Sequence, residues 1–314
     1  MIDTSPSAQR TPQGEGLFPI RTAAAMTGVH PVTLRAWERR YGLVNPRRTA
    51  KGHRLYSPED VHRIRRILEL LDQGVSIGQV APLLESPAPE PGETPATGVW
   101  PGYRRDLQAA AAAFDHHALE RIYADALSLF PVQQVIPRLL APVHRSLVED
   151  GGGPQALAAL QFFRAWARPT LGCRFRHEAS HASGPAVALC PYPRQGDGLE
   201  ADMLALLLAT HDLRVLRLCG PGQLEAVGTL QARSGAGAVV LVGPAPLAEA
   251  VMRKTLPRWS AHLPVPVFAA GPAAKAHTPA LERAGLIPLD PDPQRAAGTI
   301  HARLQDPAAD DGYI

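Results

Sequence analysis

The chain has 314 residues, enough for two or three domains of about 100–200 residues each. Hydrophobic residues make up 45% and charged residues 19%, and no apolar run reaches the roughly 18 residues of a membrane helix, which argues against wholesale disorder and against a membrane protein. The cysteines at 173, 190 and 219 are far apart, so the sequence predicts neither a disulfide framework nor a cysteine zinc site. The first sixteen residues lack the apolar core of a signal peptide, and we therefore expect a cytoplasmic protein.

Positive charge is concentrated in one segment. Residues 17–84 hold eleven Lys or Arg against five Asp or Glu, whereas the stretches before and after this segment each have a slight acidic excess. Such an asymmetry is typical of a chain in which one module meets a polyanion and the rest does something else.

Composition shifts divide the chain into six pieces. They are a disordered tail, a basic helical DNA-binding domain, a proline-rich linker, a helical bundle, an α/β domain and a second tail, with expected bounds at 1–16, 17–85, 86–101, 102–182, 183–305 and 306–314. The linker has five prolines in sixteen residues, which excludes a continuous helix.

The basic segment begins with the spacing of a helix-turn-helix. A helix around Arg21 to Met26 is followed by a turn near Gly28 and by a second helix from Pro31 to Arg40. One face of the second helix is expected to pack in the core and carries Leu34, Trp37 and Tyr41. The opposite face is expected to enter a major groove and carries Val32, Thr33, Arg35, Ala36 and Arg39.

Residues 45–56, NPRRTAKGHRLY, have the pattern of a short glycine-containing hairpin, or wing. Its charge density suits phosphates or the minor groove. The predicted DNA contacts are therefore Thr33, Arg35 and Arg39 from the helix and Arg47, Arg48, Lys51, His53, Arg54 and Tyr56 from the hairpin. For His53 and Tyr56 a structural role stays open.

The remainder of the chain changes from helical to alternating patterns. From Tyr103 to about His177, alanine and leucine recur at helical spacing, and breaks at Pro131 and at residues 151–154 divide the stretch into about four helices. After Ala186, five apolar runs (AVALC, LRVLRL, GAVVLV, VPVFAA and LIPL) are interleaved with helical segments. This order predicts a flavodoxin-like parallel sheet of five strands covered on both faces, so the fold class is multidomain α and α/β.

The stretch VTLRAWERRYGL followed by RRTAKGHRLYSPEDV resembles the MerR family of winged-helix transcriptional regulators, over about residues 17–84. The version with RAWERRY is similar to the branch whose C-terminal half is a helical bundle plus a cobalamin-binding fold, with CarH/LitR light-responsive repressors and MlrA-type curli and biofilm regulators. The resemblance implies a sequence-specific regulator that binds double-stranded promoter DNA in the nucleoid and is not an enzyme.

The cofactor motifs of that branch are eroded in this sequence. Its cobalamin motif is Asp/Glu-x-His-x-x-Gly, in the loop after the first strand. Matching Asp197 to the acidic residue of the motif puts Leu199 at the histidine position and Asp202 at the glycine position. Shifting the alignment by one residue puts Gly198 at the histidine position instead. Its light-sensing motif is a Trp followed about ten residues later by Glu-His, whereas Trp166 is followed by Arg-His. The sequence therefore looks closest to MlrA-type members, and we expect no cofactor.

Three alternatives remain open. A cobalamin-dependent regulator could use His177, His181 or His211, or no protein histidine, as the cobalt ligand. An enzyme or corrinoid carrier with an accessory DNA domain is the rival from another class, and a partner-binding C-terminal half is the third. The string HEASH at 177–181 has the H-E-x-x-H pattern of zinc proteases, but a helix end is expected there and no metal site is predicted.

The resemblance also implies assembly. MerR-family regulators dimerise through a long helix after the wing, but here the helix from about Ile77 is expected to stop by Ser86, where the prolines begin. We therefore expect a homo-oligomer held together by the bundle or the α/β domain.

Overall fold

The computed structural model describes residues 16–29, 31–72, 75, 77–85, 99–192, 198–218, 224–243 and 247–305. The chain divides into two compact units, with the boundary between Val99 and Trp100. No helix of the described ranges has both the length and the apolar character needed to cross a membrane. Both predicted tails, apart from Gly16, and most of the predicted linker lie outside the described residues.

The first unit is a small helical domain with a three-stranded antiparallel sheet. Gly28 ends the first helix in the left-handed conformation, with φ of 70°, and Gly42 does the same after the second helix, with φ of 62°. Ser57 and Asp60 cap the third helix reciprocally through backbone N–H groups, at 2.9 and 3.2 Å. The elements are β1 (Phe18–Pro19), α1 (Ile20–Thr27), α2 (Pro31–Ala36), the π-helical turn η1 (Trp37–Tyr41), β2 (Arg47–Arg48), β3 (Arg54–Tyr56), α3 (Pro58–Asp72) and α4 (Ile77–Glu85).

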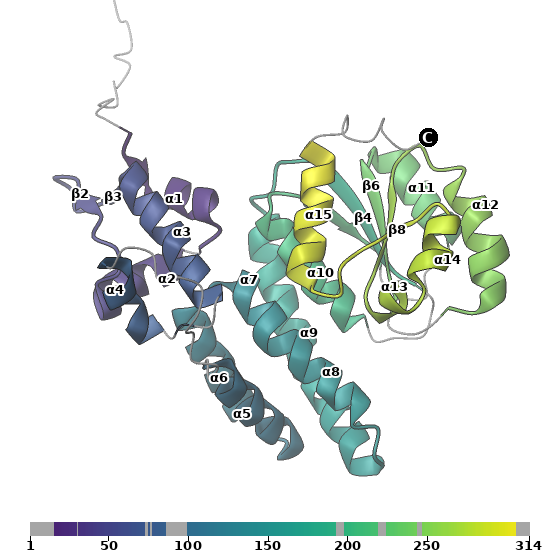
Figure 1. Ribbon diagram of the computed structural model, residues 1–314, viewed down its shortest axis with the longest axis horizontal. Helices are drawn as coiled ribbons and strands as arrows, with labels where there is room; N and C mark the ends of the chain where they lie inside the picture. The colour runs from purple at the N-terminus through teal and green to yellow at the C-terminus, as the bar shows by residue number, and fades with distance from the viewer. Residues whose placement is uncertain are drawn as a thin grey trace, which may run out of the picture. The chain divides into compact units, whose positions relative to one another are not determined.

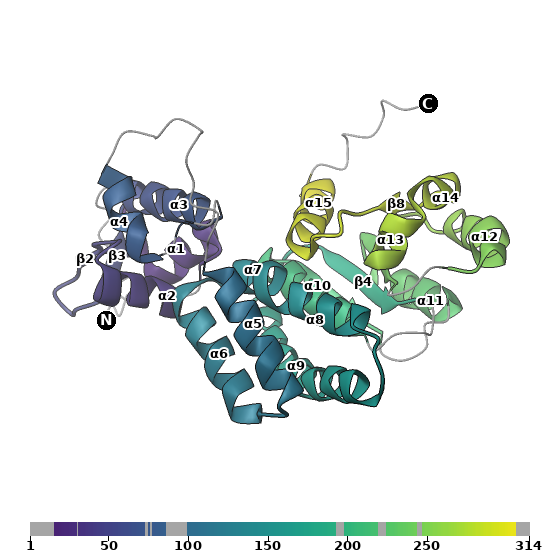
Figure 2. The ribbon, with the colours of Figure 1, turned by 60° about the horizontal axis from the view of Figure 1, so that its bottom comes forward.

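The second unit begins with four consecutive helical rods, as predicted (Figure 2). The breaks fall where the sequence places them, at Pro131 and before Pro154. The rods are α5 (Trp100–Ala112), α6 (His116–Leu129), the run of α7 (Val132–Val135), η2 (Ile136–Leu140) and α8 (Ala141–Glu149), and α9 (Pro154–Ala179).

One boundary of the bundle differs from the expectation. Trp100 and Pro101, placed in the linker by composition, are the first residues of α5. Proline is tolerated in the first helical turn, where its missing N–H has no intrahelical partner to lose. Trp100 is buried against Phe130, with ring centroids 4.5 Å apart, and this packing anchors the start of the bundle.

The rest of the second unit is the predicted parallel sheet, and all five strands are present (Figure 1). The strand order β5-β4-β6-β7-β8 is the flavodoxin-like one, and every neighbouring pair is parallel. The strands are β4 (Ala186–Pro191), β5 (Arg214–Arg217), β6 (Ala238–Val242), β7 (Val267–Ala270) and β8 (Ile287–Pro288).

Helices cover both faces of this sheet (Figure 1). One face carries α10 and α15, and the other carries α11, α12 and α14. Most of α10 is buried, because it lies among α9, α15 and the first two strands of the sheet. Their bounds are α10 (Leu199–Thr210), α11 (Leu224–Ser234), η3 (Val251–Thr255), α12 (Leu256–Ser260), α13 (Pro272–Ala276), α14 (Thr278–Arg283) and α15 (Pro293–Gln305).

Candidate nucleic-acid interface

An exposed stripe runs along the second helix of the helix-turn-helix. Val32, Arg35 and Arg39 are exposed and Ala36 is half-buried. Their spacing of three and four residues places these side chains above one another on one face of a helix. The stripe therefore presents two guanidinium groups beside small apolar side chains.

The opposite face of the same helix belongs to the core. Leu34 and Trp37 are fully buried, and Tyr41 is half-buried because the π-helical turn changes the phase of the last residues. Thr33, which the sequence placed among the DNA contacts, is 2% exposed. At about 100° per residue Thr33 lies only about 40° from Trp37 around the helix, so it joins the core face. Burial removes its side chain from the candidate surface.

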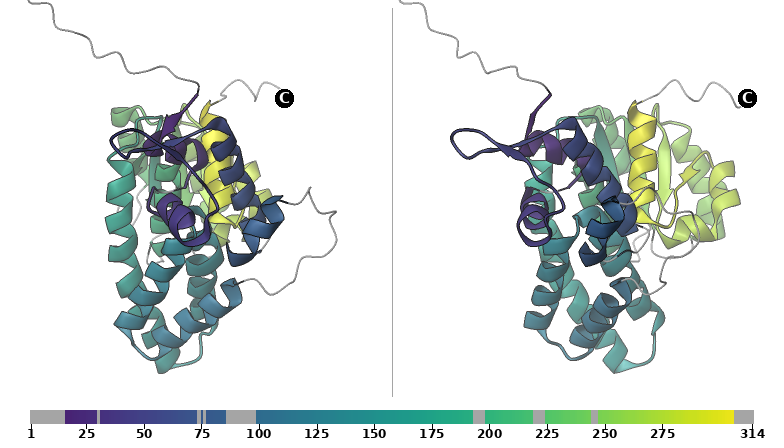
Figure 3. Two further views of the ribbon diagram at one scale, coloured as in Figure 1. Left: turned by 90° about the vertical axis from the view of Figure 1, so that its left-hand side faces the viewer. Right: turned by 60° about the vertical axis from the view of Figure 1, so that its left-hand side comes forward.

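The predicted hairpin is present and supplies the second group of cations. Strands β2 and β3 pair in antiparallel register, with Arg48 opposite Arg54. Gly52 takes a left-handed φ of 80° at the turn, and the backbone N–H of His53 donates to Thr49 Oγ1 at 3.1 Å. The hairpin extends away from the helices of its own unit (Figure 3). Exposed side chains on it are Arg47, Arg48, Lys51 and His53.

Glu38 joins the hairpin to the helix-turn-helix. Its carboxylate accepts hydrogen bonds from Arg48 Nη2, at 2.7 Å, and from Arg54 Nε. Burial raises the pKa of the Glu38 carboxyl, but the hydrogen bonds and charges of Arg54 and Arg48 outweigh burial and leave the pKa below its ordinary value of 4.5. Arg48 stays half exposed while Arg54 is mostly buried, so Arg48 keeps N–H groups available at the surface.

Tyr56 does not lie on this surface. The side chain is fully buried at the end of β3, and its hydroxyl has no hydrogen-bond partner among the described residues. Burial raises the pKa of Tyr56 to about 12, and the nearby charge of Glu38 acts in the same direction. The sequence offered Tyr56 as a DNA contact or a structural residue, and its burial favours the structural role.

Sequence reasoning missed two features of this surface. Arg40 is exposed next to Arg39 but was not singled out, although its place in the run of two arginines was the available signal. The Glu38 clamp had no such signal, because its partners are 10 and 16 residues away and depend on the hairpin register. Arg63 supports the core instead of the surface, since its Nε donates to the backbone oxygen of Leu43 at 2.6 Å.

The carboxyl edge of the parallel sheet is the other place where ligands bind in such folds. Leu199 begins α10 and is buried, and Asp202 lies one turn later with its carboxylate almost covered. Asp197 lies outside the described residues. The glycine at position 243, after β6, is explained by close packing, because a Cβ there would lie 2.9 Å from the backbone oxygen of Tyr192.

The remaining candidate motifs fall at structural positions. Trp166 is buried in the bundle, where its Nε1 donates to Glu120 Oε1 at 2.9 Å. In the HEASH string, α9 ends at Ala179, so His181 lies beyond the helix that carries His177. No group of three or more metal-ligating side chains occurs in the described ranges.

Comparisons with known proteins agree with a helix-turn-helix in the first unit. Residues 18–86 match the family model "MerR HTH family regulatory protein". The chain is 33% identical over 144 residues to the HTH-type transcriptional regulator MlrA of Salmonella typhimurium, covering 46% of this chain and 57% of MlrA. It is 29% identical over 276 residues to the HTH-type transcriptional repressor CarA of Myxococcus xanthus, covering 83% and 89%. The match to MlrA thus spans little more than half of that relative's length.

The chain also has a structural neighbour. A Methanosarcina barkeri monomethylamine corrinoid protein superposes with a TM-score of 0.51 at 13% identity, over 64% of this chain and 98% of that chain. At this identity the likeness concerns the fold alone. The likeness therefore supports the fold described for the helical bundle and the flavodoxin-like sheet.

Proposed function

We propose that this chain, whose residues 18–86 match the MerR helix-turn-helix family model, is a transcriptional regulator that binds double-stranded DNA sequence-specifically. The observation that carries the proposal is the exposed pair Arg35 and Arg39, which share one helix face next to a cationic hairpin. Guanidinium groups on a recognition helix can read guanine edges in the major groove. The hairpin arginines then hold the phosphate backbone.

The roles within this surface differ by position. Arg35 and Arg39 are proposed to contact bases, and Val32 offers a methyl-rich contact for thymine. Arg47, Arg48 and Lys51 are proposed to contact phosphates, with His53 beside them. Arg54 is proposed to position the hairpin through Glu38, because its guanidinium is mostly buried.

Binding assays on single variants test this proposal. Arg35→Ala and Arg39→Ala are each expected to weaken operator binding by about 1–3 kcal/mol and to relax sequence preference, because a base contact is lost. Arg47→Ala is expected to weaken all sequences alike and to reduce the salt dependence by about one unit of slope. The assay is fluorescence anisotropy at several salt concentrations, with an operator and a scrambled duplex.

Arg105→Ala serves as the charge-matched control, since Arg105 is well exposed on α5 in the second unit. Its operator affinity should equal that of the unmodified chain. Unchanged binding in all three variants of the first unit would remove the basis of the proposal.

For the second unit we propose a sensory or assembly role without catalysis and without histidine-ligated cobalamin. Cobalamin, if bound here, would supply cobalt chemistry, and a histidine would be the protein's ligand to the cobalt. Here buried Leu199 occupies the expected histidine position at the start of α10. His211 follows the far end of α10, about 18 Å along the helix. His181 lies just before β4, at the amino edge of the sheet. These residues do not fit that ligand set.

A cofactor-retention experiment tests the second part. The full chain mixed with adenosylcobalamin is expected to emerge colourless from gel filtration and to bind its operator equally in light and in darkness. Retention of a corrin absorption spectrum at one equivalent would favour the cobalamin-dependent alternative. The DNA-binding proposal would survive that outcome, because the two readouts are independent.

A further inference from the structure

A cavity of about 370 Å³ lies between α6 and α9 of the helical bundle. From α6 it is lined by His116 and Glu120, which are four residues apart and therefore share one helix face. Its volume is in the usual range of small-molecule sites. The residues that line it from α9 are Phe162, Ala165, Trp166, Pro169 and Thr170.

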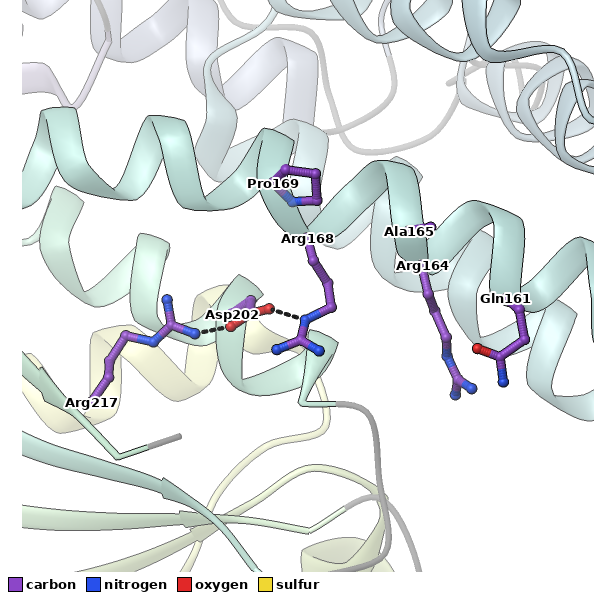
Figure 4. A pocket seen from close by; sticks show the side chains of 7 residues that line it. All are labelled: Gln161, Arg164, Ala165, Arg168, Pro169, Asp202 and Arg217. Carbon is purple, nitrogen blue, oxygen red and sulfur yellow. Dashed lines mark hydrogen bonds and ion pairs between the residues drawn. The ribbon is translucent and has the colours of Figure 1, made fainter. Parts of the chain in front are cut away.

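Helix α9 has different neighbours on its two sides. Toward α10, Arg168 points at Asp202, whose carboxylate accepts hydrogen bonds from Arg168 and Arg217 (Figure 4). Pro169 lies on the opposite side of α9 from Arg168 in this view. Neither Arg168 nor Asp202 lines the cavity beside α6, so the charge of that cavity depends on other residues.

Glu120 gives this cavity a negative charge. Its Oε1 accepts a hydrogen bond from Trp166 Nε1 at 2.9 Å. No lysine or arginine belongs to the described lining, and no described residue forms an ion pair with Glu120; His116 is the other titratable side chain of the lining. A carboxylate has about four lone-pair sites, so Glu120 can accept further hydrogen bonds. The lining therefore favours a cationic ligand.

The walls around this carboxylate are mostly apolar, and the aromatic ones are held by other rings. Trp166 is 3% exposed and meets Tyr123 edge to face, with ring centroids 5.6 Å apart. Phe162 meets Phe114 in the same manner at 5.5 Å. Because packing and the hydrogen bond to Glu120 fix the indole, the site needs little ordering when a ligand arrives, which favours binding.

We propose that this cavity binds a small organic cation, an ammonium group on a flat apolar body, with Glu120 as its ionic contact. The ammonium donates to the Glu120 carboxylate, and the apolar body packs against Phe162 and Trp166. An anion is repelled by Glu120, whereas a neutral ligand of the same shape gains only the apolar contacts. The proposal goes beyond DNA binding, since it gives the second unit a ligand of its own.

Isothermal titration of the full chain with three matched probes tests the site. Phenethylamine, which carries an ammonium at neutral pH, is compared with phenethyl alcohol and phenylpropionate, because all three share one aromatic body and differ in charge. We expect saturable binding of the amine, about three- to fivefold tighter than of the alcohol, and the weakest binding of the carboxylate. The preference is modest because Glu120 is an exposed residue.

Two variants separate charge from shape. Glu120→Gln keeps an oxygen for Trp166 Nε1 but removes the charge, so it should abolish the preference for the amine and leave the affinity for the alcohol unchanged. A folding defect would instead weaken both probes. Ala165→Leu fills part of the cavity and should weaken the amine and the alcohol alike; Ala165 is exposed, so the longer side chain does not disturb the core.

Glu149→Gln is the charge-matched control. Glu149 is an exposed glutamate at the end of α8, outside the cavity lining, and its substitution should leave all three affinities unchanged. Operator binding by Glu120→Gln should stay normal, so failure of this proposal is distinguishable from failure of the DNA-binding proposal.

Other outcomes would overturn the proposal. These are absence of saturable phenethylamine binding, equal affinity for the amine and the alcohol, or a preference for the amine that survives in Glu120→Gln. Equal losses in Glu120→Gln and Glu149→Gln would show a general effect of surface charge. Tighter binding of Nα-acetyl-lysine amide than of phenethylamine would overturn the assignment of a flat apolar body.

Discussion

The hydroxyl of Tyr56 lies in the core of the first unit, where no described residue hydrogen-bonds it. Leaving a buried hydroxyl without a partner costs free energy, whereas a ring of the same shape without the hydroxyl does not incur that cost. The position of Thr33 on its helix has a similar consequence. The neighbouring residue Val32 is exposed, whereas Thr33 lies on the same side of the helix as Trp37 and is buried with it. At this scale, burial decides which polar side chains belong to the proposed DNA-binding surface.

The first prediction at this scale concerns Tyr56→Phe. The variant is expected to keep its operator affinity and to keep or raise its free energy of unfolding, by up to about 1–2 kcal/mol, because an unpaired buried polar group is removed. Chemical denaturation followed by circular dichroism, together with anisotropy, measures both quantities. A loss of operator affinity with intact folding would return Tyr56 to the DNA-binding surface.

Glu38 acts between elements, since it belongs to the helix-turn-helix and binds two arginines of the hairpin. The lowered pKa of its carboxyl means that the charged form is favoured in the folded state. This contribution to stability is fully present above the ordinary pKa of 4.5 and is lost as the pH falls through the lower folded pKa. The hairpin should therefore loosen in acid.

The matching prediction uses Glu38→Gln. At pH 7 the variant is expected to lose about 1–2 kcal/mol of stability, because a neutral amide holds Arg48 and Arg54 less strongly. Below pH 4.5 its unfolding free energy should fall less steeply than that of the unmodified chain. Denaturation curves at pH 7, 5 and 3.5 compare the two proteins; parallel pH profiles would show that Glu38 does not couple the hairpin to the helix.

Local patterns predicted the elements better than the contacts between them. Four of the five strands could be foreseen from continuous apolar runs, and β5 from an apolar run interrupted by Arg214 and Arg217. The bundle breaks could be foreseen because prolines and glycines mark them. The π-helical turn at Trp37–Tyr41 has no local signature and re-aims Tyr41. The ion pairs of Asp202 could not be foreseen either, since Arg168 and Arg217 lie 34 and 15 residues away along the chain. They meet Asp202 only because α10 packs against α9 and beside β5.

At the scale of the whole molecule, the length of α4 constrains assembly. The described residues of α4 number nine and reach Glu85, about 13 Å of helix, which is too short for a coiled coil that holds two chains together. We therefore propose that self-association uses the second unit. Two tethered DNA-binding domains would then reach neighbouring half-sites with a gain in effective concentration.

Analytical ultracentrifugation of two proteins checks this proposal. A fragment ending at Glu85 is expected to sediment as a monomer and to bind a full operator much more weakly than the whole chain. The whole chain is expected to be oligomeric at the concentrations where it binds. A dimeric fragment, or a monomeric full-length chain, would place the assembly surface elsewhere.

The burial of α10 also determines where this chain can be recombined with others. A graft that cut between the bundle and the sheet would separate α10 from α9 and expose an apolar helix that has nearly no polar side of its own. A cut between Val99 and Trp100 would instead keep the bundle and the sheet together in one compact unit. Chimeras that replace the first unit with another domain should therefore fold when they are joined near residue 99. Chimeras joined near residue 183 should misfold.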